Sequence, residues 1–297
     1  MKILALHGLG SDASMLKNQL APFTKALGPS FRFTFLNGEV LCSKGPGVPS
    51  WASGPFFSYT TGFTAAEMRH ALNRLDEFVR ERGPFQGVFG FSLGASVAIA
   101  YMIDQERRSH ATPFDFAVLF SPIFVASPDA SYCERLLKRL LDQDHTPFRH
   151  AFPQGDWMPL LTSAWGSSDG GGDGDDASAA QTFVSYLQNV LAMRSLGIGD
   201  IMPNTKTDFL EEENPERIPR LLHPFLVSDR IQIPTVHIAG LGDLPCMREQ
   251  ALVAQDLCSP STVRSQNHAG GHEVPFKKSE VQTIVSSIRW AIEEAYI

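Results

Sequence analysis

The sequence lacks several features by which whole classes of protein are known. No apolar run approaches the roughly 18 to 20 residues of a membrane-spanning helix. The N-terminal run ends at His7-Gly8 without the cleavage site of a signal peptide. Basic residues (25) are outnumbered by acidic residues (32), which disfavours binding to nucleic acid or to an anionic membrane. We therefore expect a cytoplasmic protein with no membrane span and no nucleic-acid partner.

Cysteine is also scarce, and its four occurrences show neither a C-x-x-C motif nor the spacing of a zinc site. These residues are Cys42, Cys133, Cys246 and Cys258. Without a secretory signal, they are expected to be free thiols in a reducing compartment. We expect neither a metal ion nor any other cofactor.

What the sequence does contain is a regular alternation of apolar runs and amphipathic segments over 297 residues. Apolar runs predict strands at 2–8, 31–38, 85–92, 114–121 and 233–240, and a further strand is predicted at 261–266. The amphipathic segments predict helices at 64–82, 93–108, 131–143, 244–257 and 278–296. A further helix is predicted to carry Met15, Leu16, Leu20 and Phe23, with Ser11 or Asp12 as its cap. This alternation indicates one α/β domain, 1–297, with a mostly parallel sheet covered by helices on both faces.

Two segments interrupt the alternation. Residues 39–62 predict a loop rich in glycine, proline and aromatic side chains. Residues 146–226 carry apolar side chains that the alternation does not need, and we interpret them as a lid inserted over the end of the sheet where ligands bind. A plain surface excursion is the alternative. Inside this segment, the acidic and glycine-rich tract 167–178 predicts a mobile surface loop.

Two short stretches match the G-x-S-x-G motif, in which a sharp turn from strand to helix exposes a reactive serine. The stretch 90–94, with Ser92 at its centre, follows an apolar run and opens a predicted helix. Its glycines are expected because side chains there would collide with neighbouring backbone. The stretch 166–170, centred on Ser168, lies in the glycine-rich tract and has no helix to hold it. The context therefore predicts Ser92 as the nucleophile and a chance match at Ser168.

A serine nucleophile needs a histidine base and a carboxylate that orients the base, and in this kind of fold they follow the serine as acid and then histidine. His272 precedes the last helix after a Gly-Gly loop and is the predicted base, with His268 as the alternative. Asp243 stands just past the strand 233–240, so its side chain is expected in the catalytic crevice. The alternative role of Asp243 is to cap the helix that follows. His237 is predicted to be a core residue.

Acyl transfer also requires hydrogen-bond donors for the oxyanion that develops on the substrate. One donor is predicted to be the backbone N–H of Leu93, directly after the nucleophile. The other is expected in the turn after the first strand, where the N–H of Leu9 is favoured over that of Gly10. His7 is interpreted as a structural hydrogen-bonding residue rather than a second base.

Four stretches together resemble the fungal serine hydrolase family of the α/β-hydrolase fold, and within it the thioesterases of fungal polyketide gene clusters. They are LALHGLGSD near the N-terminus, GFSLGA at 90–95, HIAGLGD ending at Asp243, and GGHEVP around His272. The resemblance covers nearly the whole chain apart from 146–226. Members of the family often carry Gln after the nucleophile, where this chain has Leu93. Because the oxyanion donor there is a backbone group, the difference should change the polarity of the pocket and not the mechanism.

The resemblance implies hydrolysis of an acyl thioester, with release of a polyketide from the acyl carrier domain of its synthase. Ser92 would form an acyl-enzyme with His272 as base and Asp243 as its orienting group. An extended acyl chain would fit aromatic side chains of the loop and the lid, for which we single out Trp51, Phe56, Trp157 and Trp165. Docking of an acidic carrier domain would need a basic face, for which the candidates are Arg135, Lys138 and Arg139, or Arg107-Arg108.

Three other functions remain open from the sequence. A carboxylesterase acting on small oxygen esters would use the same residues. An acyltransferase would replace water by an alcohol or an amine. A non-catalytic acyl-binding protein could keep the fold, although the order of Ser92, Asp243 and His272 along the chain argues against it.

Overall fold

The computed structural model describes residues 1–45, 47–109, 111–142, 174–193 and 214–297. The chain divides into two compact units. The first unit comprises Met1–Thr60, His70–Val125 and Asp229–Ile297. The second comprises Thr61–Arg69 and Ala126–Ser228. Helix α3 (Ala65–Arg82) has residues in both, and it ends where Gly83-Pro84 predicts a stop.

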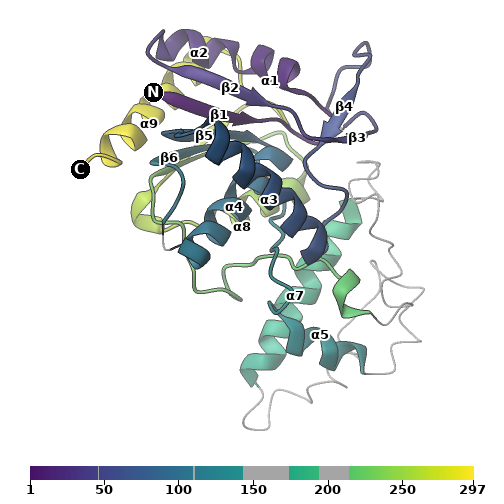
Figure 1. Ribbon diagram of the computed structural model, residues 1–297. Coiled ribbons are helices and arrows are strands. Elements are labelled where there is room, and N and C mark those ends of the chain that lie inside the picture. The colour runs from purple at the N-terminus through teal and green to yellow at the C-terminus, as the bar shows by residue number, and fades with distance from the viewer. Residues whose placement is uncertain (46, 110, 143–173, 194–213) are drawn as a thin grey trace. The chain divides into compact units, whose positions relative to one another are not determined.

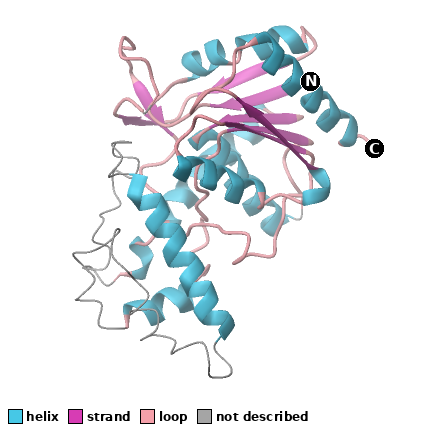
Figure 2. Cartoon of the chain, turned by 180° about the vertical axis from the view of Figure 1, so that it is seen from behind, coloured by secondary structure: helices cyan, strands magenta, loops and turns pink. Residues whose placement is uncertain are grey.

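The first unit is built on a six-stranded sheet with the order β2-β1-β5-β6-β7-β8, in which every neighbouring pair is parallel (Figures 1 and 2). Its strands are β1 (Lys2–Leu6), β2 (Arg32–Leu36), β5 (Gly87–Phe91), β6 (Phe116–Phe120), β7 (Thr235–Gly240) and β8 (Val263–His268). The first and last residues of each strand lie within two residues of the predicted strand ends. Because all strands run the same way, their carboxyl ends meet at one edge of the sheet, which is where ligands bind in such folds.

Helices cover both faces of this sheet, as the alternation predicts. One face carries α1 (Ala13–Gln19), α2 (Ala21–Leu27) and α9 (Lys278–Glu294). The other carries α4 (Leu93–Ser109), which packs on β1, β5 and β6, and α8 (Pro245–Gln255), which packs on β7. The first unit therefore has the α/β-hydrolase architecture of a parallel sheet between two layers of helices, and this prediction is confirmed.

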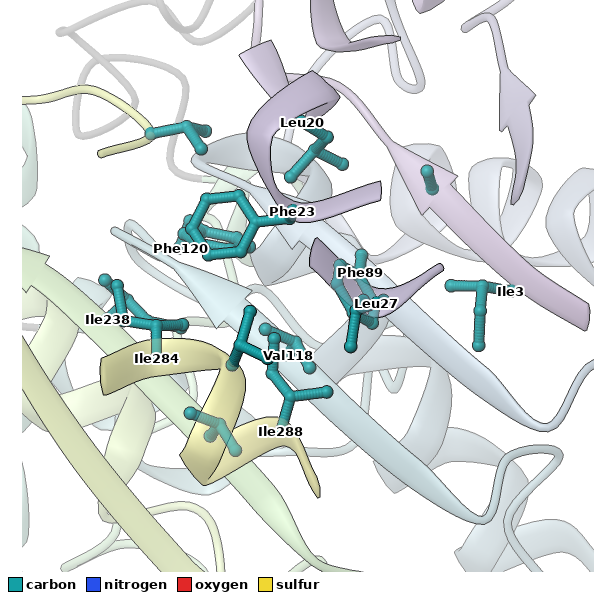
Figure 3. Close-up of a cluster of buried hydrophobic side chains, with 14 of the residues drawn as sticks. Ile3, Leu20, Phe23, Leu27, Phe89, Val118, Phe120, Ile238, Ile284 and Ile288 are labelled. Carbon is teal, nitrogen blue, oxygen red and sulfur yellow. The ribbon is translucent and has the colours of Figure 1, made fainter. Parts of the chain in front are cut away.

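The main core lies between the sheet and the first of these helical layers (Figure 3). Phe23 of α2 is fully buried, and its ring meets the ring of Phe120 of β6 edge-on at 5.3 Å between centroids. Ile284 and Ile288 of α9 reach the same layer as Val118 of the sheet. This packing fixes the helices on the sheet, since burial of each such side chain contributes on the order of 2 kcal/mol.

The predicted helix after β1 is in fact two short helices that meet at Leu20. Pro22 lies in the first turn of α2, and a proline has no N–H to continue the hydrogen bonds of a preceding helix. Asp12 is the cap of α1, because its Oδ1 accepts hydrogen bonds from the N–H groups of Ser14 (2.6 Å) and Met15 (2.8 Å). Of the two predicted caps, the structure thus selects Asp12.

The predicted loop 39–62 contains a small antiparallel sheet of β3 (Val40–Cys42) and β4 (Phe56–Ser58). Strands of three residues are too short to show a periodic pattern, which explains why the sequence predicts only a loop. Phe57 of β4 is bonded to the turn after β1: its carbonyl accepts from the N–H of Gly10 (3.1 Å), and its N–H donates to the carbonyl of Ser11 (2.9 Å). The β3–β4 hairpin therefore holds this turn in place.

The second unit includes α5 (Glu134–Leu141), α7 (Gly174–Ala192) and a single 3-10 turn, η3 (Pro215–Arg217). Arg220 is almost fully buried there, and its guanidinium donates to the carbonyl oxygens of Ala130 (3.2 Å), Pro215 (2.7 Å) and Ile218 (3.2 Å). These bonds tie together segments about 90 residues apart. The interpretation of 146–226 as a lid stays a prediction.

One part of the tract predicted as a mobile loop is helical. Residues 174–178, the end of the tract 167–178, form the start of α7. Asp176 lies in this first turn, where a negative charge is favourable next to the free N–H groups of the helix, and it also pairs with Arg135 at 2.8 Å. The rest of the tract, with Ser168, lies outside the described residues. Among the helices that the structure describes, none is long and apolar enough to cross a membrane.

Candidate active site

Ser92 occupies the sharp turn between β5 and α4 at the carboxyl edge of the sheet. Its φ is +53°, a left-handed conformation that non-glycine residues seldom adopt and that marks a strained turn. The flanking glycines leave the space this turn needs. A methyl group at Gly90 would collide with the backbone of Ala95, and one at Gly94 would collide with the carbonyl oxygens of Leu6 and His7. The expected reason for both glycines is therefore confirmed.

Ser92, His272 and Asp243 form one hydrogen-bonded chain. The Oγ atom of Ser92 lies 2.9 Å from Nε2 of His272. Nδ1 of the same ring lies 2.7 Å from Oδ2 of Asp243. The side chains of His272 and Asp243 are 14% and 5% exposed, so bulk water competes little for these bonds. The three residues come from three different loops, after β5, β8 and β7, which meet at the same edge of the sheet.

The second carboxylate oxygen of Asp243 is also engaged. Oδ1 accepts a hydrogen bond from the N–H of Leu244 at 2.8 Å. Leu244 is the N-cap residue of α8, and no side chain caps the helix there. The alternative interpretation of Asp243 as a helix cap therefore does not describe its bonds. Each oxygen has a separate partner, and this fixes the plane of the carboxylate against the ring of His272.

The loops that carry Asp243 and His272 are joined by backbone hydrogen bonds. The N–H of Leu241 donates to the carbonyl of His268 (2.9 Å), and the N–H of Gly242 donates to the carbonyl of Gly270 (2.9 Å). A methyl group at Gly240 would collide with the carbonyl oxygens of Gly270 and Gly271. Asp243 and His272 are thus held by backbone contacts between their loops as well as by the hydrogen bond between their side chains.

The two predicted oxyanion donors lie beside Ser92. Leu93 is the first residue of α4, and the first N–H groups of a helix have no partner inside it. Leu9 follows Gly8, whose α-carbon lies so close to Ser92 that an added methyl group would be 3.3 Å from the serine Cβ. Neither N–H donates to any part of the chain that the structure describes. Both are therefore available to a substrate oxygen.

Comparison with known proteins agrees with this geometry. Residues 1–284 match the profile of the family described as serine hydrolase (FSH1). The esterase alnB of Emericella nidulans is 36% identical over 297 residues, which cover 99% of this chain and 97% of that protein. The chain belongs to the FSH1 serine hydrolase family. It is therefore an enzyme, a serine hydrolase.

Two further relatives of this FSH1-family chain are more distant. The serine hydrolase cnsH of Penicillium expansum is 25% identical over 253 residues, with 84% of this chain and 95% of that protein covered. The hydrolase FUB4 of Fusarium oxysporum f. sp. lycopersici is 24% identical over 310 residues, with 96% and 99% covered. The 36% match covers 99% of the chain and therefore includes residues 146–226, which the sequence resemblance leaves out.

The FSH1-family site contains a second buried histidine beside its first strand. His7 is fully buried, and its ring contacts Gly8, Gly38 and Tyr59. The sequence predicts a structural role for His7 but gives no hint of Gly38 or Tyr59 as its partners. No local pattern could have revealed them, because the three segments meet only in the folded sheet.

Two other histidines, His268 and His237, are buried and make contacts outside the hydrogen bonds of Ser92, His272 and Asp243. His268 is buried, and its Nδ1 accepts from the N–H of Gly270 at 3.1 Å, so it supports the loop that carries His272. His237 is buried in β7, with Nε2 3.5 Å from Sγ of Cys258. Its prediction as a core residue is confirmed. All four cysteines are free thiols, which confirms that prediction too.

The burial of His237 makes the stability of this FSH1-family enzyme depend on pH. Burial lowers the pKa of His237 to about 3, from an ordinary value of 6.5. Below pH 6.5 the His237 imidazole binds a proton in the unfolded chain, whereas in the folded chain it binds this proton only near pH 3. The free energy of unfolding should therefore fall by about 1.4 kcal/mol per pH unit from this residue over that range. Urea unfolding of the wild type at pH 7, 6 and 5 measures the slope.

Comparison with His237→Gln isolates the contribution of this residue. In the variant, the free energy of unfolding should change with pH by about 1.4 kcal/mol per pH unit less than in the wild type, whatever its value at pH 7. His70→Gln, at an exposed position on α3, is the control for the replacement of a histidine by glutamine. Equal slopes in the wild type and His237→Gln would contradict the prediction.

Of the four aromatic residues predicted to contact substrate, two are described. Trp51 is 83% exposed in the segment between β3 and β4, and Phe56 is half-buried at the start of β4. The segment between these strands runs alongside the catalytic loop, since a methyl group at Gly47 would lie 3.6 Å from the carbonyl oxygen of His272. Trp157 and Trp165 lie outside the described residues.

Proposed function

We propose that the enzyme hydrolyses an acyl thioester through an acyl-enzyme on Ser92, and that its substrate is a polyketide chain held by the acyl carrier domain of a synthase. The observation that carries the proposal is the series of hydrogen bonds from Ser92 through His272 to Asp243, next to the N–H groups of Leu9 and Leu93, which donate to none of the described residues. This is the arrangement that nucleophilic acyl transfer requires.

The first half of the reaction forms the acyl-enzyme. Oγ of Ser92 attacks the carbonyl carbon while Nε2 of His272 takes the hydroxyl proton. The oxyanion of the tetrahedral intermediate accepts hydrogen bonds from the N–H groups of Leu9 and Leu93. When the C–S bond breaks, the departing thiolate receives the proton from His272. Asp243 stabilises the imidazolium that exists between these two proton transfers.

The second half of the reaction releases the acid. A water molecule takes the place of the thiol and gives a proton to Nε2 of His272 as it attacks the ester carbonyl. The same two N–H groups bind the second oxyanion. Collapse of this intermediate breaks the bond to Oγ of Ser92, which recovers its proton from His272. The free enzyme and a carboxylic acid result.

The thioester part of the proposal rests on the sequence resemblance and on apolar side chains near the site. Trp51 is exposed on a segment that runs alongside His272, and Leu241 and Leu244, which flank Asp243, are 56% and 40% exposed. Exposed apolar groups around a catalytic serine suit an acyl chain better than a small polar acid.

Four of the five basic residues considered for carrier docking form ion pairs with neighbouring carboxylates. Arg107 and Arg108 contact Asp229 and Asp104, at 2.6 and 3.4 Å. Arg135 contacts Asp176 at 2.8 Å, and Lys138 contacts Glu134 at 2.5 Å. Because neighbouring carboxylates neutralise these four side chains, we do not assign the docking of an acidic carrier domain to them.

A second candidate function is hydrolysis of small oxygen esters by the same residues. The observation that favours it is the name of the relative with 36% identity, which is an esterase. The two candidates differ in the leaving group and in the length of the acyl chain. They do not differ in the catalytic residues.

Matched substrates distinguish the two candidates. Acyl N-acetylcysteamine thioesters and the corresponding ethyl esters, each with a short and with a medium acyl chain, are compared by kcat/KM. Each value is divided by the rate constant for hydrolysis of the same substrate by hydroxide. This correction removes the different intrinsic reactivity of the two esters. We expect at least about a tenfold corrected preference for the longer thioesters, because one or two methylenes are worth about that factor in an apolar pocket.

Ser92→Ala is the control and should hydrolyse neither substrate above background. A preference for short oxygen esters that disappears in Ser92→Ala would favour the carboxylesterase. Turnover of thioesters that persists in Ser92→Ala would contradict the proposed mechanism for either candidate.

A further inference from the structure

The ring of His7 lies directly behind the turn that carries Leu9. Its Nε2 atom lies 3.0 Å from the N–H of Gly38, and its Nδ1 atom lies 2.8 Å from the carbonyl oxygen of Gly8. The ring is fully buried and packs against the ring of Tyr59, with 4.7 Å between centroids. The two ring nitrogens therefore contact backbone groups of two segments, one after β1, which lies next to Ser92, and one after β2.

These two contacts define where the proton of the ring must be. The N–H of Gly38 can only donate, so Nε2 is the acceptor and carries no hydrogen. A neutral imidazole then carries its hydrogen on Nδ1, which donates to the carbonyl oxygen of Gly8. Burial lowers the pKa of His7 below its ordinary value, so the ring is neutral near neutral pH.

The bond to Gly8 determines the direction of another group. The Gly8–Leu9 peptide is trans, so the N–H of Leu9 points opposite to the carbonyl of Gly8. The hydrogen bond from Nδ1 of His7 keeps the carbonyl of Gly8 pointing toward the imidazole. The N–H of Leu9 is therefore directed away from the imidazole, and the Gly8 α-carbon that precedes it packs against Cβ of Ser92.

The imidazole is itself held in place. The backbone N–H of His7 donates to the hydroxyl of Tyr59 at 2.6 Å, and this hydroxyl donates to the carbonyl of Leu36 at 3.1 Å. Gly38 cannot move closer or turn easily, because a methyl group there would collide with the carbonyl of Ser58. The position of the ring is thus determined by three segments, after β1, β2 and β4.

We propose that His7 is a positioning residue of the oxyanion hole, whose Nδ1–H tautomer fixes the Gly8–Leu9 peptide so that the Leu9 N–H faces the reacting carbonyl. The inference rests on the proposed function, because it requires that Leu9 donates to the oxyanion. His7 itself touches neither substrate nor Ser92. Its effect is to make the donor rigid before the oxyanion forms, which is when a hydrogen bond contributes most to the rate.

Two substitutions separate the two ring contacts. In His7→Asn, the side-chain amide nitrogen can take the place of Nδ1 and still donate to Gly8. In His7→Gln, the terminal group reaches the place of Nε2, and the donor to Gly8 is lost. Both variants remove the imidazole and are of similar polarity, so each serves as the matched control of the other.

The readout is the ratio of kcat for an oxygen ester to kcat for the matched thionoester, in which sulfur replaces the carbonyl oxygen. Sulfur accepts hydrogen bonds weakly, so thionoester hydrolysis depends little on the oxyanion donors. We expect His7→Gln to lower kcat for the oxygen ester by about 10- to 100-fold, somewhat less than the loss of a whole donor. KM should stay within about twofold, and the ratio should fall with kcat. His7→Asn should keep most of the ratio of the wild type.

The outcomes are distinguishable from failure of the proposed function. If Ser92→Ala keeps the activity of the wild type, the proposed function is wrong and the inference fails with it. If Ser92→Ala is inactive but both His7 variants keep the ratio of the wild type, only the inference is wrong, and His7 has a purely structural role. A fall in melting temperature with an unchanged ratio has the same meaning.

A measurement on the wild-type enzyme covers the case in which the variants do not fold. Nitrogen-15 chemical shifts of labelled histidine distinguish the two tautomers of a neutral imidazole. With the signals of the other eight histidines assigned by their own variants, the remaining signals belong to His7 and should show hydrogen on Nδ1. Hydrogen on Nε2 would overturn the proposal.

Discussion

Replacing Ser92 by alanine is expected to lower kcat by about 10⁴-fold or more, with little change in stability. A serine, a histidine and an aspartate that are linked by hydrogen bonds in this way act as a unit, so loss of the nucleophile removes the contribution of all three. The positive φ of residue 92 and the space left by Gly90 and Gly94 do not depend on the hydroxyl group, so the turn should persist. The measurement is kcat on the substrate that the wild type prefers.

Ser168→Ala is the matched control for this experiment, because it removes the serine of the other G-x-S-x-G stretch. It should keep the activity of the wild type. A fluorophosphonate should label the wild type and Ser168→Ala but not Ser92→Ala. Activity of Ser92→Ala within tenfold of the wild type, or its labelling by the fluorophosphonate, would remove the assignment of the nucleophile.

Replacing Asp243 by asparagine should lower kcat by about 10⁴-fold as well, through the tautomer of His272. The N–H of Leu244 requires an acceptor at the position of Oδ1, so the amide oxygen should take that place. The amide NH₂ would then face Nδ1 of His272, which must become the acceptor. The hydrogen of the ring would move to Nε2, the nitrogen that has to accept the proton of Ser92.

Asp256→Asn, at the C-terminal cap of α8, is the control for the removal of a carboxylate from the same region. It should leave kcat unchanged within a factor of about two. Activity of Asp243→Asn above one-tenth of the wild type would mean that the carboxylate does not set the tautomer of His272. Asp243→Ala would then show whether the side chain contributes at all.

The sequence predicts the sheet and the catalytic order well because both depend on local patterns. The four inner strands β1, β5, β6 and β7 are apolar and buried on both sides of the parallel sheet, and such strands are recognisable without knowledge of their neighbours. Ser92, Asp243 and His272 each follow a strand, and parallel strands bring their carboxyl ends to one edge. The sequence order alone therefore indicates that these residues meet, although it does not indicate the distances between them.

What the sequence does not reveal depends on contacts between distant segments. The bonds of His7 with Gly38 and Tyr59 join residues 31 and 52 positions apart, and no periodic pattern encodes them. The break at Leu20 depends on whether tertiary packing tolerates Pro22 inside one helix or divides it into two. The sequence does not predict the start of α7, because the glycine content of the tract indicates a loop more strongly than its acidic residues indicate a first helical turn.

The parallel pairing of β1 with β5, which sets Leu6 opposite Gly90, also bears on how such an enzyme can change over evolutionary time. The two N–H groups of Leu9 and Leu93 belong to the main chain, and they follow strands that end side by side. Because both proposed donors are main-chain groups, a substitution of the half-buried side chain at position 9 would leave both N–H groups in place. The substrate preference of such an enzyme can therefore change through its side chains while the main-chain groups proposed to bind the oxyanion stay the same.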